Sequence, residues 1–281
     1  MEHIRRQEWI DAGGGYGWFN SYYDNHQHPL EGVTENGVRM MLTGQVFAIM
    51  SGTATDEQVL SITRSADRFL YRKEAGGYRL NTDFHELKFD MGRMFGFAYG
   101  EKENGAVFSH MTVMYANALY RRGFVREGYK ALQSLADAAL DFQTSKIYPG
   151  IPEYFNANGR GMYHYLTGAA SWYMLTMITE VFGVHGENGA LVIAPKLVRE
   201  QFDKTGRAAI DFSFAGKRFH AAVVNPAGKD FGDCHISRAY LNGLSPSAVQ
   251  GIPVENDRAV LSQELLHTLP ESGNTIMIEL M

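Results

Sequence analysis

The sequence has little that would support a disulfide framework, a nucleic-acid interface or a membrane span. Its only cysteine is Cys234, which excludes an intramolecular disulfide and any zinc site made of several cysteines. The formal net charge is -5, so the composition does not favour nucleic-acid binding. No apolar run reaches the ~18 residues that a transmembrane helix needs, and residues 1–12 lack the apolar core of a signal peptide. We therefore expect a cytoplasmic protein with no membrane or nucleic-acid partner.

Common catalytic motifs are missing as well. The sequence contains no G-x-S-x-G, no H-E-x-x-H and no P-loop. The glycines of DAGGGYG, residues 11–17, follow no predicted strand and precede no predicted helix, so they do not form a dinucleotide fingerprint. His26 and His28 stand close together, but no third ligand is near them. We expect neither a metal nor an organic cofactor.

Apolar helical patterns are abundant in the first two thirds of the chain. The 281 residues are 45% hydrophobic, which is enough for a sizeable core. Stretches that are apolar on nearly all sides alternate with amphipathic ones, as inner and outer helices of a toroid would. Gly52 ends one stretch, and Thr55 with Gln58 forms a capping box at the start of the next. The helical patterns cover residues 38–51, 55–71, 105–123, 125–142 and 167–183.

The pattern changes after about residue 190. Short alternating runs separated by Gly, Pro and Asn indicate strands and hairpins in residues 189–197, 207–228, 235–243 and 274–280. The sequence thus predicts a mainly α fold, a partial toroid of helical hairpins, followed by a small all-β domain. We place the helical domain at residues 1–190 and a β-sandwich-like domain at residues 191–281.

Two polar stretches are candidate sites. In YLTGAASW, Thr167 fits a helix N-cap and Gly168 allows close backbone approach, so the free amides there predict an anion site for phosphate. In GEKENGAVFSH, a helix that begins at Asn104–Gly105 would place His110 about two turns inside it, facing a core or a cavity. An ordinary capped helix and a buried core histidine remain the alternatives.

Lys102 and Glu103 lie in the same polar stretch. One side chain donates hydrogen bonds and the other accepts them, a pair that can hold a polyhydroxylated ligand. A solvated loop is the alternative. Aromatic rings can stack on sugars or simply pack in a core. The rings concerned are Trp18, Tyr22, Tyr23, Tyr154, Phe155, Tyr163 and Tyr165.

Six strings together resemble glycoside hydrolase family 94, the cellobiose, laminaribiose and 1,2-β-oligoglucan phosphorylases. They are WFNSYYDN, LTGQVFAIMSGTATDEQ, GEKENGAVFSH, YRRGFVREGYKAL, YLTGAASW and VFGVHGENGALVIAPKL. The resemblance implies an (α/α)6 barrel with a C-terminal β-domain. It also implies inverting cleavage of β-glucosides by inorganic phosphate, which acts as co-substrate and yields α-D-glucose 1-phosphate.

The resemblance also implies roles for individual residues. Lys102 and Glu103 match sugar-binding positions, and His110, Thr167 and Gly168 match the phosphate-binding set. A further sugar-binding position matches Glu153, where many members have a glutamine.

The family's general acid is an Asp in an Asp-Trp-Asn-Asp stretch, which this sequence lacks. Phosphate is already a nucleophilic anion, so the reaction needs one acid rather than two carboxyl groups. The resemblance therefore implies the C-terminal part of an enzyme, roughly half a barrel, with no catalytic residue of its own and no activity alone. Its partner would be the missing N-terminal half or another copy of the chain.

Two other functions remain open at this point. One is a non-catalytic carbohydrate-binding or complementing subunit, and the other is a helical toroid with lyase- or hydrolase-like activity. Phosphate-independent cleavage would favour the second. The sequence specifies neither the sugar linkage nor the length of the acceptor.

Overall fold

The computed structural model describes residues 1–148, 150–165, 167–242 and 250–281. It divides into two compact units, Met1–Met174 and Leu175–Met281. The domain boundary expected near residue 190 stays a prediction. No helix in these described ranges is long and apolar enough to cross a membrane.

The prediction of a mainly α chain with a partial (α/α)6 toroid is wrong. Helices take up 34% of the structure and strands 28%, and the strands form several separate sheets. Most of the strand residues lie in the unit Leu175–Met281. In addition, the segments between the helices of the first unit pair into hairpins, whose strands of two to five residues are too short to show a period in the sequence.

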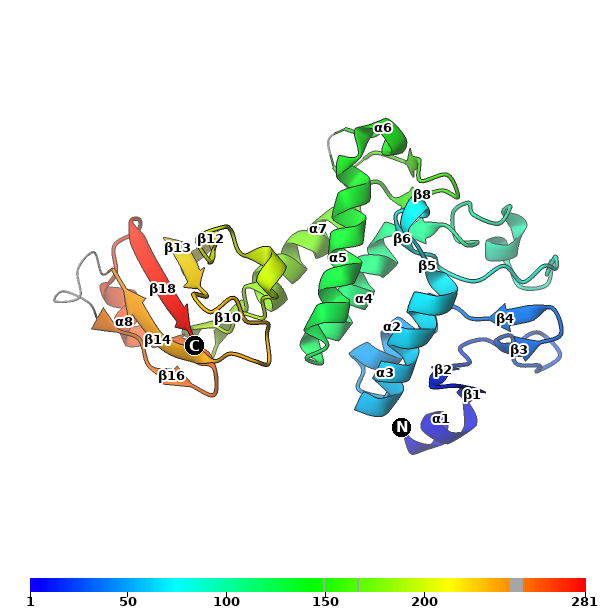
Figure 1. Cartoon of the computed structure of the whole chain (residues 1–281), viewed down its shortest axis with the longest axis horizontal. Helices are drawn as coiled ribbons and strands as arrows, with labels where there is room; N and C mark the ends of the chain where they lie inside the picture. Colours follow the sequence, from blue (N-terminus) through cyan, green and yellow to red (C-terminus); the bar gives the residue numbers. More distant parts are fainter. Residues whose placement is uncertain (149, 166, 243–249) are drawn as a thin grey trace. The chain divides into compact units, whose positions relative to one another are not determined.

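The helices that begin at Leu42, Asp56, Ser109 and Val125 lie within the predicted ranges, although the first and the third begin four residues later than predicted (Figure 1). Thr55 caps its helix as expected, since its hydroxyl accepts from the Gln58 amide at 3.3 Å and the Gln58 side chain accepts from the Thr55 amide at 3.0 Å. The helices are α1 (Glu2–Gln7), α2 (Leu42–Met50), α3 (Asp56–Ser65), α4 (Ser109–Arg121), α5 (Val125–Leu140) and α6 (Phe142–Ser145), while α7 (Gly168–Thr176) crosses into the second unit. A π-helical turn, Ala66–Leu70, extends α3.

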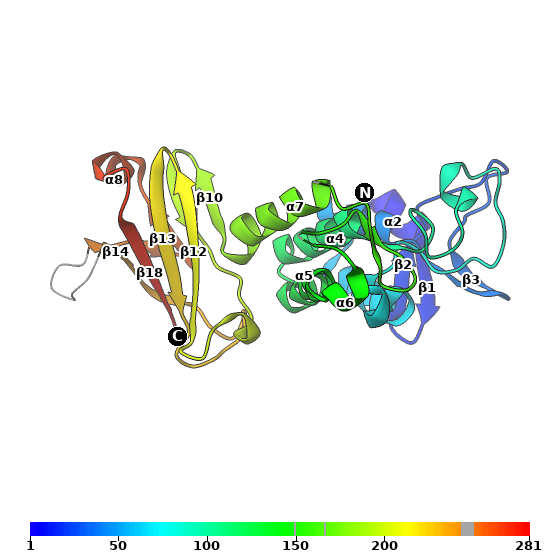
Figure 2. The same cartoon turned by 90° about the horizontal axis from the view of Figure 1, so that it is seen from above.

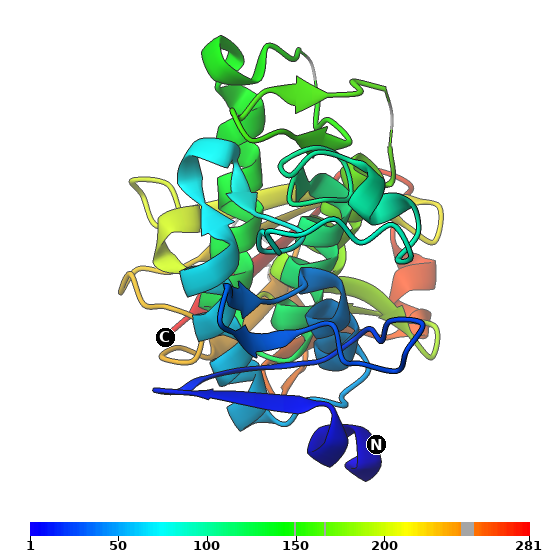
Figure 3. The ribbon, with the colours of Figure 1, turned by 90° about the vertical axis from the view of Figure 1, so that its right-hand side faces the viewer.

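The strands of this unit form antiparallel hairpins and one three-stranded sheet, β7-β8-β9. Figure 3 shows the β1–β2 hairpin beside α1. Their bounds are β1 (Trp9–Gly13), β2 (Tyr16–Phe19), β3 (Gly32–Thr34), β4 (Gly37–Arg39), β5 (Tyr71–Arg72), β6 (Gly77–Tyr78), β7 (Val107–Phe108), β8 (Tyr154–Phe155) and β9 (Gly161–Met162).

Helix α4 forms the centre of the core of this unit. Val113, Tyr115, Leu119 and Tyr120 are all buried, which agrees with a helix that is apolar on nearly all sides. Burying a large apolar side chain contributes about 1.5–3 kcal/mol. The position of α4 is therefore strongly fixed, and so is the position of any side chain in its first turn.

The unit Leu175–Met281 is built mainly from strands, as predicted. A five-stranded sheet has the order β12-β13-β18-β14-β15, and a four-stranded sheet has the order β10-β11-β17-β16. Strands β13 and β18 pair in parallel, and β12 lies on the other side of β13 (Figure 2). The bounds are β10 (Val184–Glu187), β11 (Ala190–Ile193), β12 (Arg207–Phe214), β13 (Lys217–Val224), β14 (Ile236–Leu241), β15 (Gln250–Gly251), β16 (Val254–Glu255), β17 (Arg258–Leu261), α8 (Gln263–Thr268) and β18 (Asn274–Leu280).

Glu31 is a buried carboxyl group that connects two segments of the first unit. It is only 5% exposed. One oxygen accepts from the amide and the hydroxyl of Ser21, and the other accepts from the Met41 amide at 2.7 Å. Burial raises the pKa of Glu31 from 4.5 to about 7, although these hydrogen bonds oppose the rise.

This raised pKa predicts that stability depends on pH. Because the folded pKa exceeds the unfolded one, the contribution of Glu31 is complete below pH 4.5 and is lost as the pH rises through about 7. The free energy of unfolding should fall by roughly 3 kcal/mol over that range from this group. Glu31→Gln should remove this slope and the exposed control Glu57→Gln should keep it, as measured by chemical denaturation from acidic to mildly alkaline pH. An unchanged slope in Glu31→Gln would refute the assignment.

Candidate functional site

His110 lies in the first turn of α4, not two turns inside a helix. The expected helix start at Asn104–Gly105 is wrong, because residues 107–108 form strand β7 and pair with β8. The amide of Ser109 then donates to the carbonyl oxygen of Glu153 at 3.0 Å. This bond places the beginning of α4 directly beside the segment that contains Glu153.

His110 contacts Gly168, as a single phosphate site containing both residues would require. A Cβ atom on Gly168 would lie 2.9 Å from Cε1 and 3.0 Å from Nδ1 of His110, so the imidazole packs directly on the glycine backbone. Thr167 caps α7 as predicted, since its hydroxyl accepts from the Ala169 amide at 3.2 Å. The ring of Trp172, one turn further along α7, lies 5.7 Å from the imidazole centre. A histidine therefore faces the amide end of a helix.

The environment of His110 favours its neutral form. Burial lowers the pKa of its imidazole. Within the described part of the chain, its Nε2 atom is buried and has no hydrogen-bond partner. An unpaired buried polar atom costs free energy, so it marks a position where a ligand with a complementary group would be stabilised.

Lys102 lies at the tip of a tight bend after the 3-10 turn Arg93–Gly96. Its φ angle is +46°, which is uncommon for a residue with a side chain. Its Nζ atom lies 4.5 Å from the centre of the Tyr163 ring and 5.5 Å from that of Phe97. A hydrogen bond with Tyr163 raises the pKa of Lys102. The ammonium group is thus held over an aromatic surface in its charged form.

Glu103 turns toward a different neighbour. One carboxylate oxygen lies 3.4 Å from Nη2 of Arg93. The other, Oε2, is buried and lacks a hydrogen-bond partner among the described residues. Lys102 and Glu103 therefore do not pair with each other, and each keeps hydrogen-bonding capacity for a polar ligand.

Glu153 lies between the two candidate stretches. Its carboxylate accepts from the Tyr165 hydroxyl at 3.3 Å, and its amide donates to the carbonyl oxygen of Tyr163 at 3.1 Å. Its own carbonyl accepts from Ser109, next to His110. Strands β7, β8 and β9 thus gather the predicted sugar-binding and phosphate-binding residues around one small sheet.

The predicted aromatic residues differ in their exposure, so only some of them could stack on a ligand. Trp18 and Phe155 are fully buried and belong to the core, so they cannot stack on a ligand. Tyr163 and Tyr165 are exposed at the site, and their ring centres lie 6.2 Å apart. Tyr154 is buried beside them. Tyr22 and Tyr23 are half-exposed in the N-terminal segment.

Sequence analysis missed Glu101, although it lies in the stretch GEKENG. It accepts from the Tyr154 hydroxyl at 3.2 Å and from the Asn156 side-chain amide at 3.3 Å. Burial, followed by the charge and hydrogen bond of Glu101, raises the pKa of Tyr154. These partners are more than fifty residues away, so no local pattern could have indicated them.

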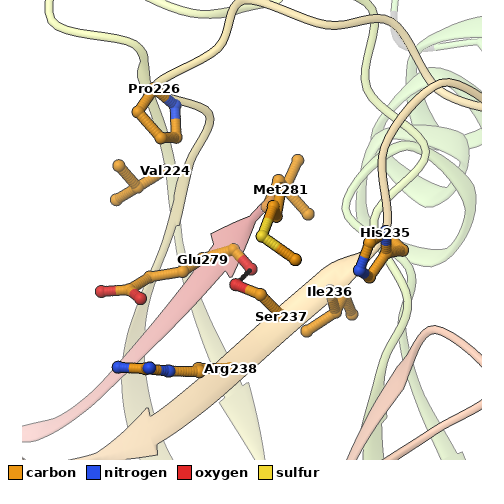
Figure 4. Close-up of a pocket in the computed structure, with 9 residues that line it drawn as sticks. Val224, Pro226, His235, Ile236, Ser237, Arg238, Glu279 and Met281 are labelled. Carbon is orange, nitrogen blue, oxygen red and sulfur yellow. Dashed lines mark hydrogen bonds between the residues drawn. The ribbon is translucent and has the colours of Figure 1, made fainter.

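The unit Leu175–Met281 has a separate surface pocket of about 690 Å³ (Figure 4). Arg238 and Glu279 occupy paired positions on β14 and β18, and the Ser237 hydroxyl donates to the Glu279 carbonyl oxygen at 2.9 Å. The pocket contains none of the predicted site residues.

Comparison with known families identifies the family of the chain. The model of the glycosyl hydrolase 94 superfamily catalytic domain matches residues 1–183. The chain belongs to this family. The matched range includes Lys102, Glu103, His110 and Glu153 as well as the start of α7.

Curated relatives are disaccharide phosphorylases by name. A solabiose phosphorylase from Paenibacillus borealis is 26% identical over 85% of this chain and 31% of its own length. An N,N'-diacetylchitobiose phosphorylase from Vibrio proteolyticus is 23% identical over 86% of this chain and 31% of its own length. A cellobionic acid phosphorylase from Neurospora crassa is 26% identical over 57% of this chain and 22% of its own length. The chain thus spans less than a third of each of these relatives.

The contact between Gly168 and His110 gives a direct test of the site. In Gly168→Ala, the new Cβ atom should push the imidazole away, while overall stability changes by only about 1 kcal/mol because alanine also favours the helix. The Cε1–H resonance of His110 should therefore shift in NMR spectra. Gly96→Ala is the matched control, since nothing lies within 4 Å of the Cβ position there. An unmoved His110 signal in Gly168→Ala would contradict the packing.

Proposed function

We propose that this chain is part of an inverting phosphorylase. The enzyme would cleave β-linked glucosyl disaccharides or oligosaccharides with inorganic phosphate and release α-D-glucose 1-phosphate. The observation that carries this proposal is the imidazole of His110 packed against Gly168 at the start of α7. Family membership and the names of the relatives support the same reaction class.

Phosphate is the anion expected at this position. The first amides of a helix have no acceptor within the helix, and of those in α7 the Ala169 amide donates to the Thr167 hydroxyl, while the helix dipole favours negative charge there. Nε2 of His110 supplies a further buried polar group without a partner in the described part of the chain. Thr167 contributes the capping hydroxyl that orients the helix start. In this proposal phosphate is a co-substrate and no other cofactor takes part.

The sugar would bind beside the phosphate. Lys102 would donate hydrogen bonds to sugar hydroxyls, while Glu103 and Glu153 would accept them. The exposed rings of Tyr163 and Tyr165 offer apolar faces to the C–H side of a pyranose. The relatives are named for different disaccharides, so the proposal concerns the reaction class rather than one linkage.

The general acid is the remaining requirement. The chain lacks the Asp-Trp-Asn-Asp stretch, and it spans less than a third of its relatives. We therefore place the acid outside residues 1–281, on a complementing chain or a longer form of the protein. A positioned acid contributes about 10²–10⁴-fold in rate, so its absence would abolish useful turnover.

Phosphate binding tests the anion site. In calorimetry on the 281-residue chain, His110→Ala should weaken phosphate affinity by roughly 10- to 100-fold, because one charge-assisted hydrogen bond contributes roughly 1.5–3 kcal/mol. The exposed residue His267 on α8 provides the control His267→Ala. Equal affinities in all three proteins would exclude His110 from the phosphate site.

The pH dependence gives a second readout of the same site. Burial holds the pKa of His110 below its usual 6.5, and a bound anion should raise it again. Binding of sulfate, whose charge does not change near neutrality, should therefore tighten as the pH falls through the pKa of His110. A flat profile would mean that the imidazole does not face the anion.

Activity of the isolated chain tests the location of the acid. The purified protein, supplied with phosphate and several β-linked disaccharides, should release no glucose 1-phosphate. Robust turnover would show that a residue of this chain donates the proton, and the first to replace would be Glu153 at the candidate site and Asp24, a carboxylate of the N-terminal segment that accepts from the amides of His26 and His28. Sugar and phosphate binding without turnover would also fit a non-catalytic binding subunit. Turnover that appears when the N-terminal part of a relative is added would favour part of an enzyme over a non-catalytic subunit.

A further inference from the structure

Asn81 is a fully buried residue far in sequence from the bend that contains Lys102 and Glu103. It is 0% exposed. Its side-chain oxygen accepts from the Gly105 amide at 2.8 Å, and its side-chain nitrogen donates to Oδ1 of Asn104 at 3.0 Å. The same nitrogen donates to the Thr82 carbonyl oxygen at 2.9 Å. The Asn81 side chain therefore makes two hydrogen bonds to the end of the bend and a third to the residue that follows Asn81 in the chain.

The bend closes on itself through Asn104. The Asn104 side-chain nitrogen donates to the Phe97 carbonyl oxygen at 2.8 Å, while its backbone oxygen accepts from the Gly100 amide at 2.7 Å. The Tyr99 hydroxyl donates to the Asn81 carbonyl oxygen at 3.2 Å. Both ends of the segment 97–105 are thus connected, directly or through Asn104, to Asn81.

This segment needs such support because its backbone is strained. Lys102 has a φ angle of +46°, and Tyr163, whose ring it faces, has +60°. Non-glycine residues keep such angles only where the surrounding structure enforces them, and they concentrate at ligand-binding positions. The backbone at Gly105 is also tightly packed, because a Cβ atom there would lie 2.1 Å from the Tyr99 ring.

Asn81 is itself anchored to the core. Asn81 pairs with Met41 in an isolated β-bridge. The Leu42 amide at the start of α2 donates to the Leu80 carbonyl oxygen at 2.8 Å. On the other side, the Leu80 amide donates to the Ala106 carbonyl oxygen at 2.9 Å. Asn81 thus connects the start of α2 with the polar bend that precedes β7.

We infer that Asn81 is a positioning residue that holds Lys102 and Glu103 in the geometry needed to bind sugar. The role of Lys102 and Glu103 in sugar binding rests on the proposed function. The claim that Asn81 fixes the bend rests on the hydrogen bonds alone. Asn81 would not touch the substrate. It would act through the Gly105 amide and the side chain of Asn104.

The experiment compares Asn81→Ala, Asn104→Ala and the double variant in the 281-residue chain. Deuterium exchange followed by mass spectrometry reports on residues 97–106, and calorimetry with α-D-glucose 1-phosphate reports on the site. The control is Asn225→Ala. Asn225 is also buried and closes a loop in the other unit through its side-chain bond to the Lys229 carbonyl oxygen at 2.8 Å.

We expect faster exchange of residues 97–106 and about tenfold weaker glucose 1-phosphate binding in each single variant, but not in Asn225→Ala. Because both asparagines act through one shared hydrogen bond, the double variant should lose several-fold less than the product of the single losses. General destabilisation would not produce this coupling. Unchanged exchange in Asn81→Ala, or losses that simply multiply, would overturn the inference.

The two proposals can fail separately. If the unaltered chain does not bind glucose 1-phosphate, the sugar and phosphate assignment fails. Exchange of residues 97–106 would still decide whether Asn81 holds the bend. If the unaltered chain binds and Asn81→Ala binds equally well, the proposed function stands and the positioning role is wrong.

Discussion

The candidate site depends on the hydrogen bond from the Ser109 amide to the Glu153 carbonyl oxygen and on the pairing of β7 with β8 that leads into it. These contacts join two segments more than forty residues apart. They fix the first turn of α4 against the strand that precedes Tyr163 and Tyr165. Without them, His110 would have no reason to meet Gly168, and the polar bend at Lys102 would not face an aromatic surface. A sheet with only two residues in each strand therefore organises the whole polar centre of the first unit.

The sequence predicted the long helices well for a simple physical reason. A helix of ten or more residues repeats its apolar face several times, and its ends have specific chemistry, such as the reciprocal Thr55–Gln58 cap. The strands of residues 207–228 and 274–280 were equally visible, because they alternate over six or more residues. Strands of two residues show no period at all. The overall class was wrong because the β-rich second unit carries most of the strand residues, and because the segments between the helices of the first unit form short strands and loops rather than further helices.

The site shows the same division between local and distant information. The candidate residues stand in recognisable sequence strings, and their chemistry follows from the residue types alone; they are Lys102, Glu103, His110 and Gly168. The residues that position them cannot be recognised in this way. Asn81 and Glu101 act on partners far away in the sequence, so their roles follow from tertiary contacts and could not be inferred from spacing. The position of the helix start before His110 was misjudged for a related reason, since the pairing of β7 with β8 overrode the turn signal at Asn104–Gly105.

The electrostatics of the unit also bear on which group could protonate a leaving oxygen. Burial lowers the pKa of His110, so near neutrality its ring is an acceptor or a neutral donor and a poor source of a proton. Glu31 has the raised pKa, about 7, that an acid needs. However, it is buried, and Ser21 and Met41 already occupy both of its oxygens. A general acid needs both a suitable pKa and access to the substrate, and each of these two groups meets at most one of the conditions. Neither His110 nor Glu31 therefore combines the two properties, and the proposed function assigns the proton to a carboxylic acid outside residues 1–281.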